Sequence, residues 1–347
     1  MYAFKKSGKP DPERIVILRA LQLGDLLNAV PAFRALRAAF PNSHISLVGL
    51  SWSEEFVRRF HTYLDDFIHF PGIPGFPEQS PDLARWPSFL SAMQSRQFDL
   101  AIQMQGSGDI ANTLVSLWGA KQCAGFYLPG QSCPNPNTFL AYPEHEPEAW
   151  RHLRLMEFLG IPLQGDELEL PIFDEDWKVF QKIQEQSNLQ RNYVCIHPGS
   201  RGRERRWPPQ NFAVVADRLA ARGYQVVLTG TEAEANLTAS VALHMRASAI
   251  DLAGKTDLGS LAALVSKAQL VVSNDTGISH VAAALKTPSV ILFPIPESIR
   301  WAPKNEQLHK RIWQAMPMSP DQVLPHVEEH LENTFSYARA ESVGSGP

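Results

Sequence analysis

The stretch QLVVSNDTGISHVAAALKTPSVILFP, residues 269–294, decides the fold class of this chain. Its two ends are short apolar segments rich in Val, Ile and Leu, and the alanine-rich segment between them is interpreted as a helix. A buried strand, a helix and a second buried strand in this order predict two parallel strands joined by a helical crossover. Polar residues follow the first strand directly, where parallel sheets bind their ligands.

The same alternation of strand and helix runs through the chain twice, over 14–118 and over 192–294. It predicts an α/β architecture with two Rossmann-like parallel sheets, each covered by helices on both faces. A chain of 347 residues also exceeds the ~250–300 at which a single core stops growing. We therefore expect two domains, with the carboxyl ends of their strands facing each other across a cleft.

We place the N-terminal domain at 1–170 and the C-terminal domain at 171–315. A C-terminal helix is expected over 316–337, with the N-terminal domain as a candidate packing surface, and a disordered tail over 338–347. The stretch 127–148 holds five prolines and no periodicity. Because it is longer than most connections, we interpret it as a functional loop or a covering insertion.

Composition excludes several classes of protein. A net charge of −4 argues against a dedicated nucleic-acid binder. The three cysteines, Cys123, Cys133 and Cys195, have neither metal-binding nor disulfide spacing. The sequence shows no apolar leader and no apolar run of ~18 residues. We expect a cytoplasmic protein, with peripheral contact with the inner face of the membrane left open.

The segment HPGSRGRERRWP, residues 197–208, places four arginines within six residues directly after a predicted strand. In this arginine loop the like charges repel one another, at a cost that a bound anion relieves. Gly199 and Gly202 let backbone N–H groups approach a ligand, Ser200 adds a hydroxyl, and arginine forks match phosphate oxygens in pairs. We predict a phosphate site here; contact of some arginines with anionic lipid is the alternative.

Carboxylates follow two other predicted strands. Gly24 permits a tight turn, and Asp25 then lies at a helix N-terminus, as either a helix cap or a general base. A helix N-terminus favours the ionised carboxylate, which a base needs at the outset. Glu232 could accept hydrogen bonds from ribose, but the local pattern favours a capping box formed by Thr231 and Glu234.

The strand that ends in VVSN is followed by Asp275, Thr276, Gly277 and His280. The helix N-terminus at Thr276 and Gly277 suits a phosphate, and His280 lies one helical turn further on. A lone histidine in an apolar helix is more often a packed core residue. The position of His280 beside a polar strand end favours a ligand contact instead.

Several motifs of other enzyme classes are missing from the sequence: G-x-G-x-x-G after the first strand, G-x-x-x-x-G-K-[ST], and G-x-S-x-G. Dinucleotide oxidoreduction and P-loop hydrolysis therefore lose their usual support. The segment FDED, residues 173–176, holds an Asp-x-Asp pair that could bind a metal beside a diphosphate. We interpret it instead as the acidic first turn of a helix.

Four segments together resemble glycosyltransferase family 9, which contains the ADP-heptose:lipopolysaccharide heptosyltransferases. They are LQLGDLLNAVPAFRALRAAFP, HPGSRGRERRWP, LTGTEAE and the run from LAGKTD to ILF at 252–293. The resemblance covers residues 14–310. It implies a two-domain GT-B architecture, with acceptor binding in the N-terminal domain and nucleotide-sugar binding in the C-terminal domain. It also implies inversion at the anomeric carbon and no obligatory metal or other cofactor.

The resemblance implies roles for individual residues. Asp25 matches the general base. The donor site would be formed by Ser200, Arg201, Arg205, Glu232, Asp275, Thr276, Gly277 and His280. Weaker candidates for contact with the acceptor or its phosphates are Gly24, Arg203 and Arg206. Arg205 stands where the family usually has lysine, and Pro294 stands where many members have glycine, which leaves the exact sugar open.

The function implied is transfer of a sugar to a lipopolysaccharide core or a related glycan, with heptose from ADP-heptose as the family's usual donor. The partners would be a nucleoside diphosphate sugar and a glycolipid or oligosaccharide acceptor, with no nucleic acid. Two alternatives stay open. One is a GT-B-like nucleotide-sugar epimerase or hydrolase, and the other is a non-catalytic nucleotide-sugar-binding protein.

Overall fold

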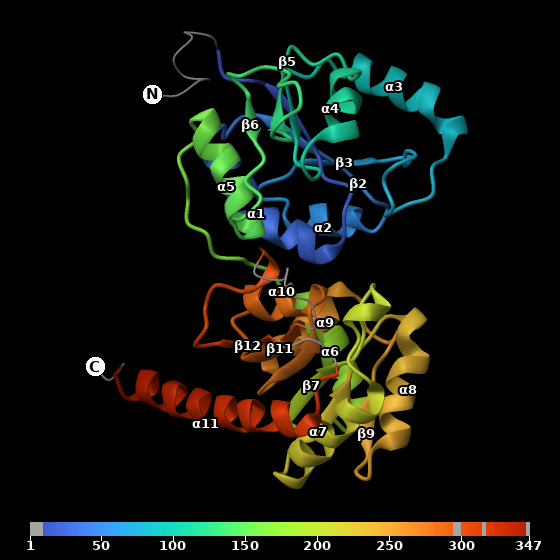
Figure 1. The fold of residues 1–347 in the computed structure, drawn as a ribbon, viewed down its shortest axis with the longest axis vertical. Helices are drawn as coiled ribbons and strands as arrows, with labels where there is room; N and C mark the ends of the chain where they lie inside the picture. Colours follow the sequence, from blue (N-terminus) through green and yellow to red (C-terminus); the bar gives the residue numbers. More distant parts are fainter. Residues whose placement is uncertain (1–9, 294–299, 314–316, 345–347) are drawn as a thin grey trace. The chain divides into compact units, whose positions relative to one another are not determined.

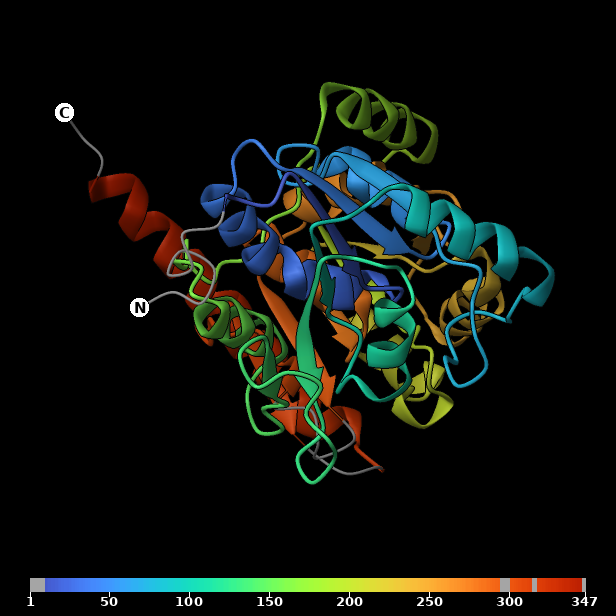
Figure 2. The same ribbon diagram turned by 90° about the horizontal axis from the view of Figure 1, so that it is seen from above.

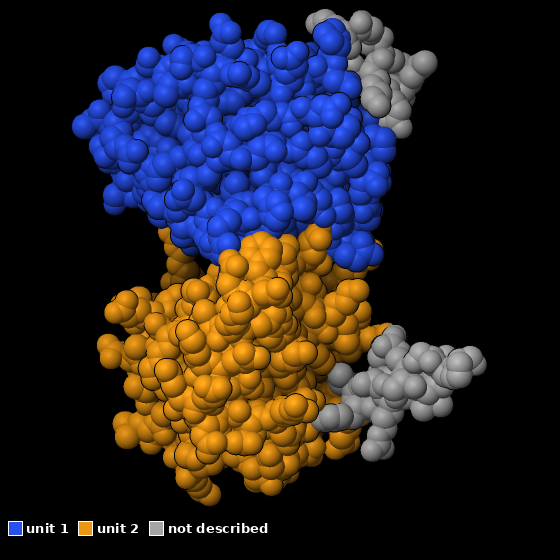
Figure 3. Space-filling model, turned by 180° about the vertical axis from the view of Figure 1, so that it is seen from behind, with its two compact units in different colours: residues 1–167 blue, residues 168–347 orange. Residues whose placement is uncertain are grey.

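A computed structural model describes residues 10–293, 300–313 and 317–344 (Figures 1 and 2). The chain divides into two compact units, residues 1–167 and 168–347 (Figure 3), where the sequence placed the division at 170/171. Pro294, which the sequence singled out, lies outside the described residues. Each unit has its own sheet and its own core.

The first unit is built on a six-stranded parallel sheet in the order β3-β2-β1-β4-β5-β6. Its strands are β1 (Arg14–Leu18), β2 (His44–Gly49), β3 (Asp66–His69), β4 (Leu100–Gln103), β5 (Gln122–Tyr127) and β6 (Phe139–Ala141). Its helices are α1 (Leu23–Ala39), α2 (Ser53–Arg59), η2 (Leu83–Arg85), α3 (Trp86–Ser95), α4 (Asp109–Ser116) and α5 (Glu148–Leu159). The strands and helices predicted over 14–118 are confirmed.

The second unit has a six-stranded parallel sheet in the order β12-β11-β10-β7-β8-β9. Its strands are β7 (Tyr193–His197), β8 (Gln225–Leu228), β9 (Ala249–Asp251), β10 (Val271–Asn274), β11 (Ser289–Phe293) and β12 (His309–Trp313). Its helices are α6 (Asp174–Ser187), η3 (Arg203–Arg205), α7 (Pro209–Ala221), η4 (Glu232–Glu234), α8 (Ala235–His244), α9 (Leu258–Lys267), α10 (Gly277–Ala284) and α11 (Pro320–Gly344).

The two sheets share one topology. In each, the first strand of the unit lies at the centre and pairs with the fourth, as β1 does with β4 and β7 with β10. In each sheet the direction in which successive strands are added reverses between the two strands of this central pair. In open parallel sheets this reversal, the topological switch point, opens a crevice beyond the carboxyl ends of the strands, and ligands bind there. The fold therefore places one candidate site in each unit.

Large apolar side chains fill the core of each unit. In the first, Phe89 and Trp118 pack with the apolar residues of β1 and β4. In the second, Trp207 and Phe212 pack with those of β7, β8 and β10. Burial of a side chain of this size stabilises the fold by about 1.5–3 kcal/mol. These cores hold the strand ends in place.

Three strands were not predicted: β5, which lies between β4 and β6, and the edge strands β6 and β12. At Gly125 in β5 a Cβ would lie 2.8 Å from the Cβ of Gln103, so only glycine allows this approach. Strand β6 has three residues and lies within 127–148, so part of that stretch joins the sheet, which the sequence did not predict. Short strands such as β6, and strands interrupted by polar residues or glycine, carry too little periodicity for recognition from the sequence.

Helix α11 packs on the second unit through Val323, Val327 and Leu331, which join the core around Trp207. Arg218 on α7 also pairs with Glu328 on α11 at 2.6 Å. The sequence-based candidate surface was the N-terminal domain. The sequence predicted a disordered tail from residue 338, whereas α11 continues to Gly344. Residues 345–347 lie outside the described residues.

Helix α6 begins at Asp174, and the carboxylate of Asp176 accepts a hydrogen bond from the N–H of Phe173 at 2.7 Å. The interpretation of 173–176 as the acidic first turn of a helix is therefore confirmed. Negative charge in this position stabilises the helix through its dipole.

Candidate active site

The turn from β1 to α1 carries Gly24 and Asp25 at the switch point of the first sheet. Asp25 is the third residue of α1, and its Oδ2 accepts a hydrogen bond from the N–H of Gln22 at 3.2 Å. The carbonyl of buried Gly24 accepts one from Nδ2 of Asn28 at 2.7 Å. The capping interpretation of Asp25 is confirmed. Its side chain is partly exposed, and the role as general base stays a prediction.

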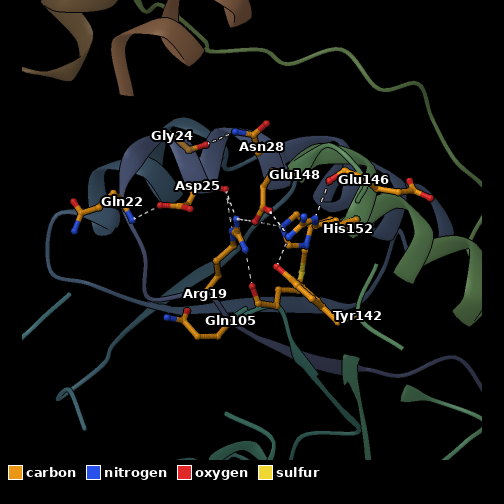
Figure 4. Close-up of polar contacts among 12 residues, drawn as sticks. Arg19, Gln22, Gly24, Asp25, Asn28, Gln105, Tyr142, Glu146, Glu148 and His152 are labelled. Carbon is orange, nitrogen blue, oxygen red and sulfur yellow. Dashed lines mark hydrogen bonds and ion pairs between the residues drawn. The ribbon is translucent and has the colours of Figure 1, made fainter. Parts of the chain in front are cut away.

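Arg19 follows β1 and is fully buried, with 0 % of its surface exposed. Its guanidinium donates two hydrogen bonds to the main-chain oxygen of Asp25, from Nε at 2.9 Å and from Nη2 at 2.7 Å (Figure 4). It donates a third, from Nη1, to the carbonyl of Met104 at 2.6 Å. Nη2 also pairs with Glu148 Oε1 at 3.1 Å. A buried cation therefore holds the backbone of the turn that carries Asp25.

Glu148 begins α5 and is the anion that compensates this charge at 3 % exposure. Arg151 and His152 lie one turn further along α5, 3.7 and 3.4 Å from the carboxylate of Glu148. Arg151 also donates to Tyr142 Oη at 2.5 Å and to the carbonyl of Glu146 at 2.8 Å. Since α5 packs along α1 (Figures 1 and 2), the cluster joins the β1–α1 turn to the segment before α5.

The segments after β1 and β4 are bridged beyond the ends of both strands. Gln105 is buried, and its Oε1 accepts a hydrogen bond from the N–H of Ala20 at 2.8 Å. Together with the bond from Arg19 to Met104, this contact closes the switch point of the first sheet around buried polar groups. Buried groups satisfied in this way make the local structure rigid.

The arginine loop follows β7 at the switch point of the second sheet. Ser200 is 2 % exposed, and its carbonyl accepts a hydrogen bond from Nε of Arg206 at 2.7 Å. Asn274, at the end of β10, is fully buried; it donates to the carbonyl of Pro198 at 2.8 Å and accepts from the N–H of Trp207 at 3.0 Å. The neighbouring strand therefore shapes the loop, and Arg206 is bonded within it.

Arg205 and Asp275 are predicted site residues that the structure brings into contact, with Nη1 3.6 Å from Oδ2. The Asp275 side chain is 8 % exposed and that of Arg205 is 42 % exposed. Burial raises the pKa of Asp275 to about 6, and the charge of Arg205 offsets only part of this effect. A carboxylate with a raised pKa at a switch point is a candidate for a functional site.

Thr276 precedes α10, which begins at Gly277. The first N–H groups of a helix give its N-terminus a partial positive charge, so the feature that suits a phosphate is present. His280 is 4 % exposed, and its ring packs edge-on at 6.2 Å from that of Trp301. The interpretation of His280 as a packed residue is therefore confirmed, while its contact with a ligand stays a prediction.

The β8–α8 turn carries Glu232, which is exposed. The predicted capping box is confirmed, because Glu234 Oε2 accepts hydrogen bonds from the N–H and Oγ1 of Thr231, both at 2.9 Å. The segment after β9 comes close to Glu232 at Gly254, where φ is +69° and a Cβ would lie 3.0 Å from the Cα of Glu232. Only glycine satisfies both constraints.

Glu234 also lies against the arginine loop. A Cβ on Gly199 would lie 2.2 Å from Glu234 Oε1, so any other residue here would displace the Glu234 carboxylate. His197, at the end of β7, is buried, and its Nδ1 lies 3.1 Å from Thr229 Oγ1. Burial lowers the pKa of His197, against the opposing effect of the Glu234 charge. The ends of β7 and β8 are thus joined by a contact between polar side chains.

The structure gathers the predicted donor residues of the second unit at the ends of three adjacent strands, β10, β7 and β8. Arg201 and Arg203 are exposed on the arginine loop. Gly24 and Asp25 belong to the first unit. The predicted site residues therefore form two groups, one in each unit, as the sequence placed them.

Three residues that organise these groups had no role assigned from the sequence: Arg19, Glu148 and Asn274, of which Asn274 had been placed at a strand end. Arg19 carries a signal, since it is a charged residue at the end of an apolar strand. Asn274 also ends such a strand. Glu148 carries none, because it lies in a proline-rich stretch among other acidic residues.

A family comparison identifies the chain. Residues 86–332 match the model of glycosyltransferase family 9 (heptosyltransferase). The chain belongs to glycosyltransferase family 9. The matched range contains the whole donor-side group, whereas Asp25 lies before it.

Relatives in the same family cover the chain to different extents. Lipopolysaccharide heptosyltransferase 2 of Salmonella typhimurium is 30 % identical over 308 residues, which are 81 % of this chain and 82 % of that protein. Lipopolysaccharide heptosyltransferase 3 of Escherichia coli K12 is 32 % identical over 161 residues, which are 46 % of this chain and 47 % of that protein. In the second comparison, the chain spans about half the length of its relative.

The structure is similar to that of ADP-heptose lipopolysaccharide heptosyltransferase II of E. coli. The TM-score is 0.73, with 20 % sequence identity over 92 % of this chain and 99 % of that chain. The predicted GT-B architecture is confirmed at the level of the fold. Among the residues that the structure describes, no helix combines the length and the apolar composition needed to cross a membrane.

Proposed function

We propose that this protein is an inverting glycosyltransferase that moves heptose from ADP-heptose to a lipopolysaccharide core acceptor. The family membership supports the reaction class, and the relatives named above support the sugar and the acceptor. Peripheral contact with the inner face of the membrane, where such an acceptor would be met, is part of the proposal.

The contact between Arg205 and Asp275 carries the proposal. It joins the arginine loop to the end of β10 at the switch point, with Ser200 and the start of α10 on the same edge of the sheet. A cation beside a helix N-terminus suits the two phosphates of a nucleoside diphosphate sugar. Arg201 and His280 would extend the contacts with the diphosphate and the sugar, and Glu232 would accept hydrogen bonds from the ribose.

In the proposed reaction an acceptor hydroxyl attacks the anomeric carbon of the heptose. A new C–O bond forms on one face while the bond to the β-phosphate breaks on the other, and ADP leaves. Negative charge grows on the diphosphate, and Arg205 together with the helix N-terminus at Thr276 and Gly277 stabilises it. Because protein groups supply this stabilisation, we propose that no metal ion is required.

Asp25 is proposed to take the proton of the attacking hydroxyl. Its place at the third position of α1 and its partial exposure support this role. A helix N-terminus favours the ionised carboxylate, which is the form that accepts a proton. Gly24, Arg203 and Arg206 are proposed to contribute to the acceptor side or its phosphates, with Arg206 limited by its bond to Ser200.

The test supplies the purified protein with ADP-heptose and heptose-deficient lipopolysaccharide core. We expect ADP release that depends on the acceptor, with an equal amount of heptosylated core by mass spectrometry. ADP release that ignores the acceptor would support a hydrolase, and ADP binding without release would support a non-catalytic protein. Transfer from a different nucleotide sugar would keep the reaction class and overturn the heptose donor.

A further inference from the structure

The buried cluster around Arg19 does more than fill the interior of the first unit. A buried arginine is rare unless it is paired. In Arg19, Nε, Nη1 and Nη2 each have a hydrogen-bond or ion-pair partner. Its bonds reach the β1–α1 turn, the segment after β4, and α5. Burying a charged side chain costs desolvation energy even when the charge is paired. We therefore expect a functional reason for the buried position of Arg19.

The target of Arg19 on α1 is the main-chain oxygen of Asp25, which receives two of its N–H groups (Figure 4). These bonds fix where the backbone of Asp25 lies. The first turn of a helix is prone to fraying, and here the intrahelical bond from Leu26 to Gln22, at 3.0 Å, is joined by the two bonds from Arg19. Glu148 in turn fixes the guanidinium by its contact at 3.1 Å.

We propose that Arg19, held by Glu148, is a positioning residue for sugar transfer, which fixes the backbone of Asp25 so that its carboxylate meets the acceptor hydroxyl. The inference rests on the proposed function of Asp25 as the base. A displacement of about 1 Å at such a group costs about 10²-fold in rate, even when the mutated residue is remote from the reaction. Arg19 itself touches no reacting atom.

Arg151 provides the matched control. It is 3 % exposed and lies 3.7 Å from the same Glu148. Its hydrogen bonds go to Tyr142, Glu144 and Glu146, all in the segment before α5. Arg151 thus shares the burial and the ion partner of Arg19 but has no bond to Asp25. A purely structural role for the cluster would make the two arginines equivalent.

The test compares Arg19→Lys with Arg151→Lys in transfer from ADP-heptose to heptose-deficient lipopolysaccharide core. Lysine keeps the charge but cannot make the paired bonds of a guanidinium. We expect Arg19→Lys to lower kcat about 10–100-fold with KM for the donor unchanged. Arg151→Lys should keep kcat, with a loss of thermal stability at least as large. Equal losses of kcat in the two variants would overturn the proposal.

A double-mutant cycle separates this inference from the proposed base. If Arg19 acts through Asp25, Arg19→Lys should not lower further the residual rate of Asp25→Asn. The same loss in both backgrounds would overturn the positioning role and leave the base in place. Wild-type kcat in Asp25→Asn alone would overturn the base, and with it the role of Arg19. If Arg19→Lys does not fold, Glu148→Gln replaces it, with the same loss of kcat expected and the same cycle.

Discussion

The two sheets share a strand order but build their switch points from opposite charges. In the first unit, Arg19 is fully buried, and its bonds go to backbone carbonyls and to Glu148 at 3.1 Å. In the second unit the buried group is the carboxylate of Asp275, and the partner described for it, Arg205, lies at the longer distance of 3.6 Å with 42 % of its side chain exposed.

The difference shows two ways in which the same topology can prepare a site. The first switch point is organised by the protein, because the buried cation is bonded to the turn that it supports. The second holds a buried carboxylate whose ionised form is disfavoured, beside an exposed cation that a phosphate can engage. Fixed geometry suits proton transfer, and an exposed cation suits the binding of a charged ligand.

The largest effect is expected at the first switch point. Asp25→Asn should lower kcat by about 10²–10⁴-fold, because the amide cannot accept the proton of the acceptor hydroxyl. The measurement is acceptor-dependent ADP release at saturating substrates. A variant with reduced donor affinity and normal kcat would assign Asp25 to donor binding. The first unit would then not differ from the second in its role.

The next largest effect is expected at Asn274, which shapes the arginine loop. Asn274→Ala leaves the N–H of Trp207 and the carbonyl of Pro198 without this partner, at about 1–3 kcal/mol for each buried group. Thermal unfolding should show a midpoint lower by about 5–10 °C. Asn211→Ala, which removes one bond to the carbonyl of Met318, is the control. An equal change in both variants would contradict the role of Asn274.

A smaller effect of opposite sign is expected at Asp275. Its pKa is about 6 when folded, above the ordinary 3.8, so the stability that protonated Asp275 contributes is present below pH ~4 and lost as the pH rises through ~6. Asp275→Asn should therefore raise the melting temperature at pH 7 by a few degrees, with the gain vanishing towards pH ~4. A gain that does not change between pH 4 and 7 would contradict the buried-carboxylate account.

The smallest effect is expected from metal removal. If Arg205 and the helix N-terminus stabilise the departing diphosphate, EDTA should leave the rate of transfer within about twofold, since no metal takes part in that step. The measurement is the initial rate before and after dialysis against EDTA, with and without added Mg²⁺. Loss of activity that Mg²⁺ restores would show that these protein groups are insufficient.

The central strands of both sheets were predictable because each is short, apolar and followed by a polar turn. The strands β5, β6 and β12 were not predicted, because they depend on pairing with a neighbouring strand and their sequences form no continuous apolar run. The packing of α11 on the second unit was not predictable either, since it depends on Val323, Val327 and Leu331 meeting a core formed by residues far away in the sequence.

The residues of the candidate site also divide into those that the sequence could predict and those that it could not. Residues at strand ends, such as Asp25 and Asp275, could be found because parallel sheets place chemistry there. Their supporting partners could not, because Glu148 reaches Arg19 from 129 positions away, and Asn274 acts through the carbonyl of Pro198. Long-range contacts of this kind leave no local pattern.

The first measurement is calorimetric titration of ADP into the wild type, Asp25→Asn and Arg205→Ala. It tests whether the second switch point binds ADP while the first serves proton transfer. We expect Asp25→Asn to bind ADP as the wild type does. We expect Arg205→Ala to bind about 10–100-fold more weakly, because a hydrogen bond to a charged group is lost. Weaker binding in Asp25→Asn, or unchanged binding in Arg205→Ala, would contradict this assignment of roles.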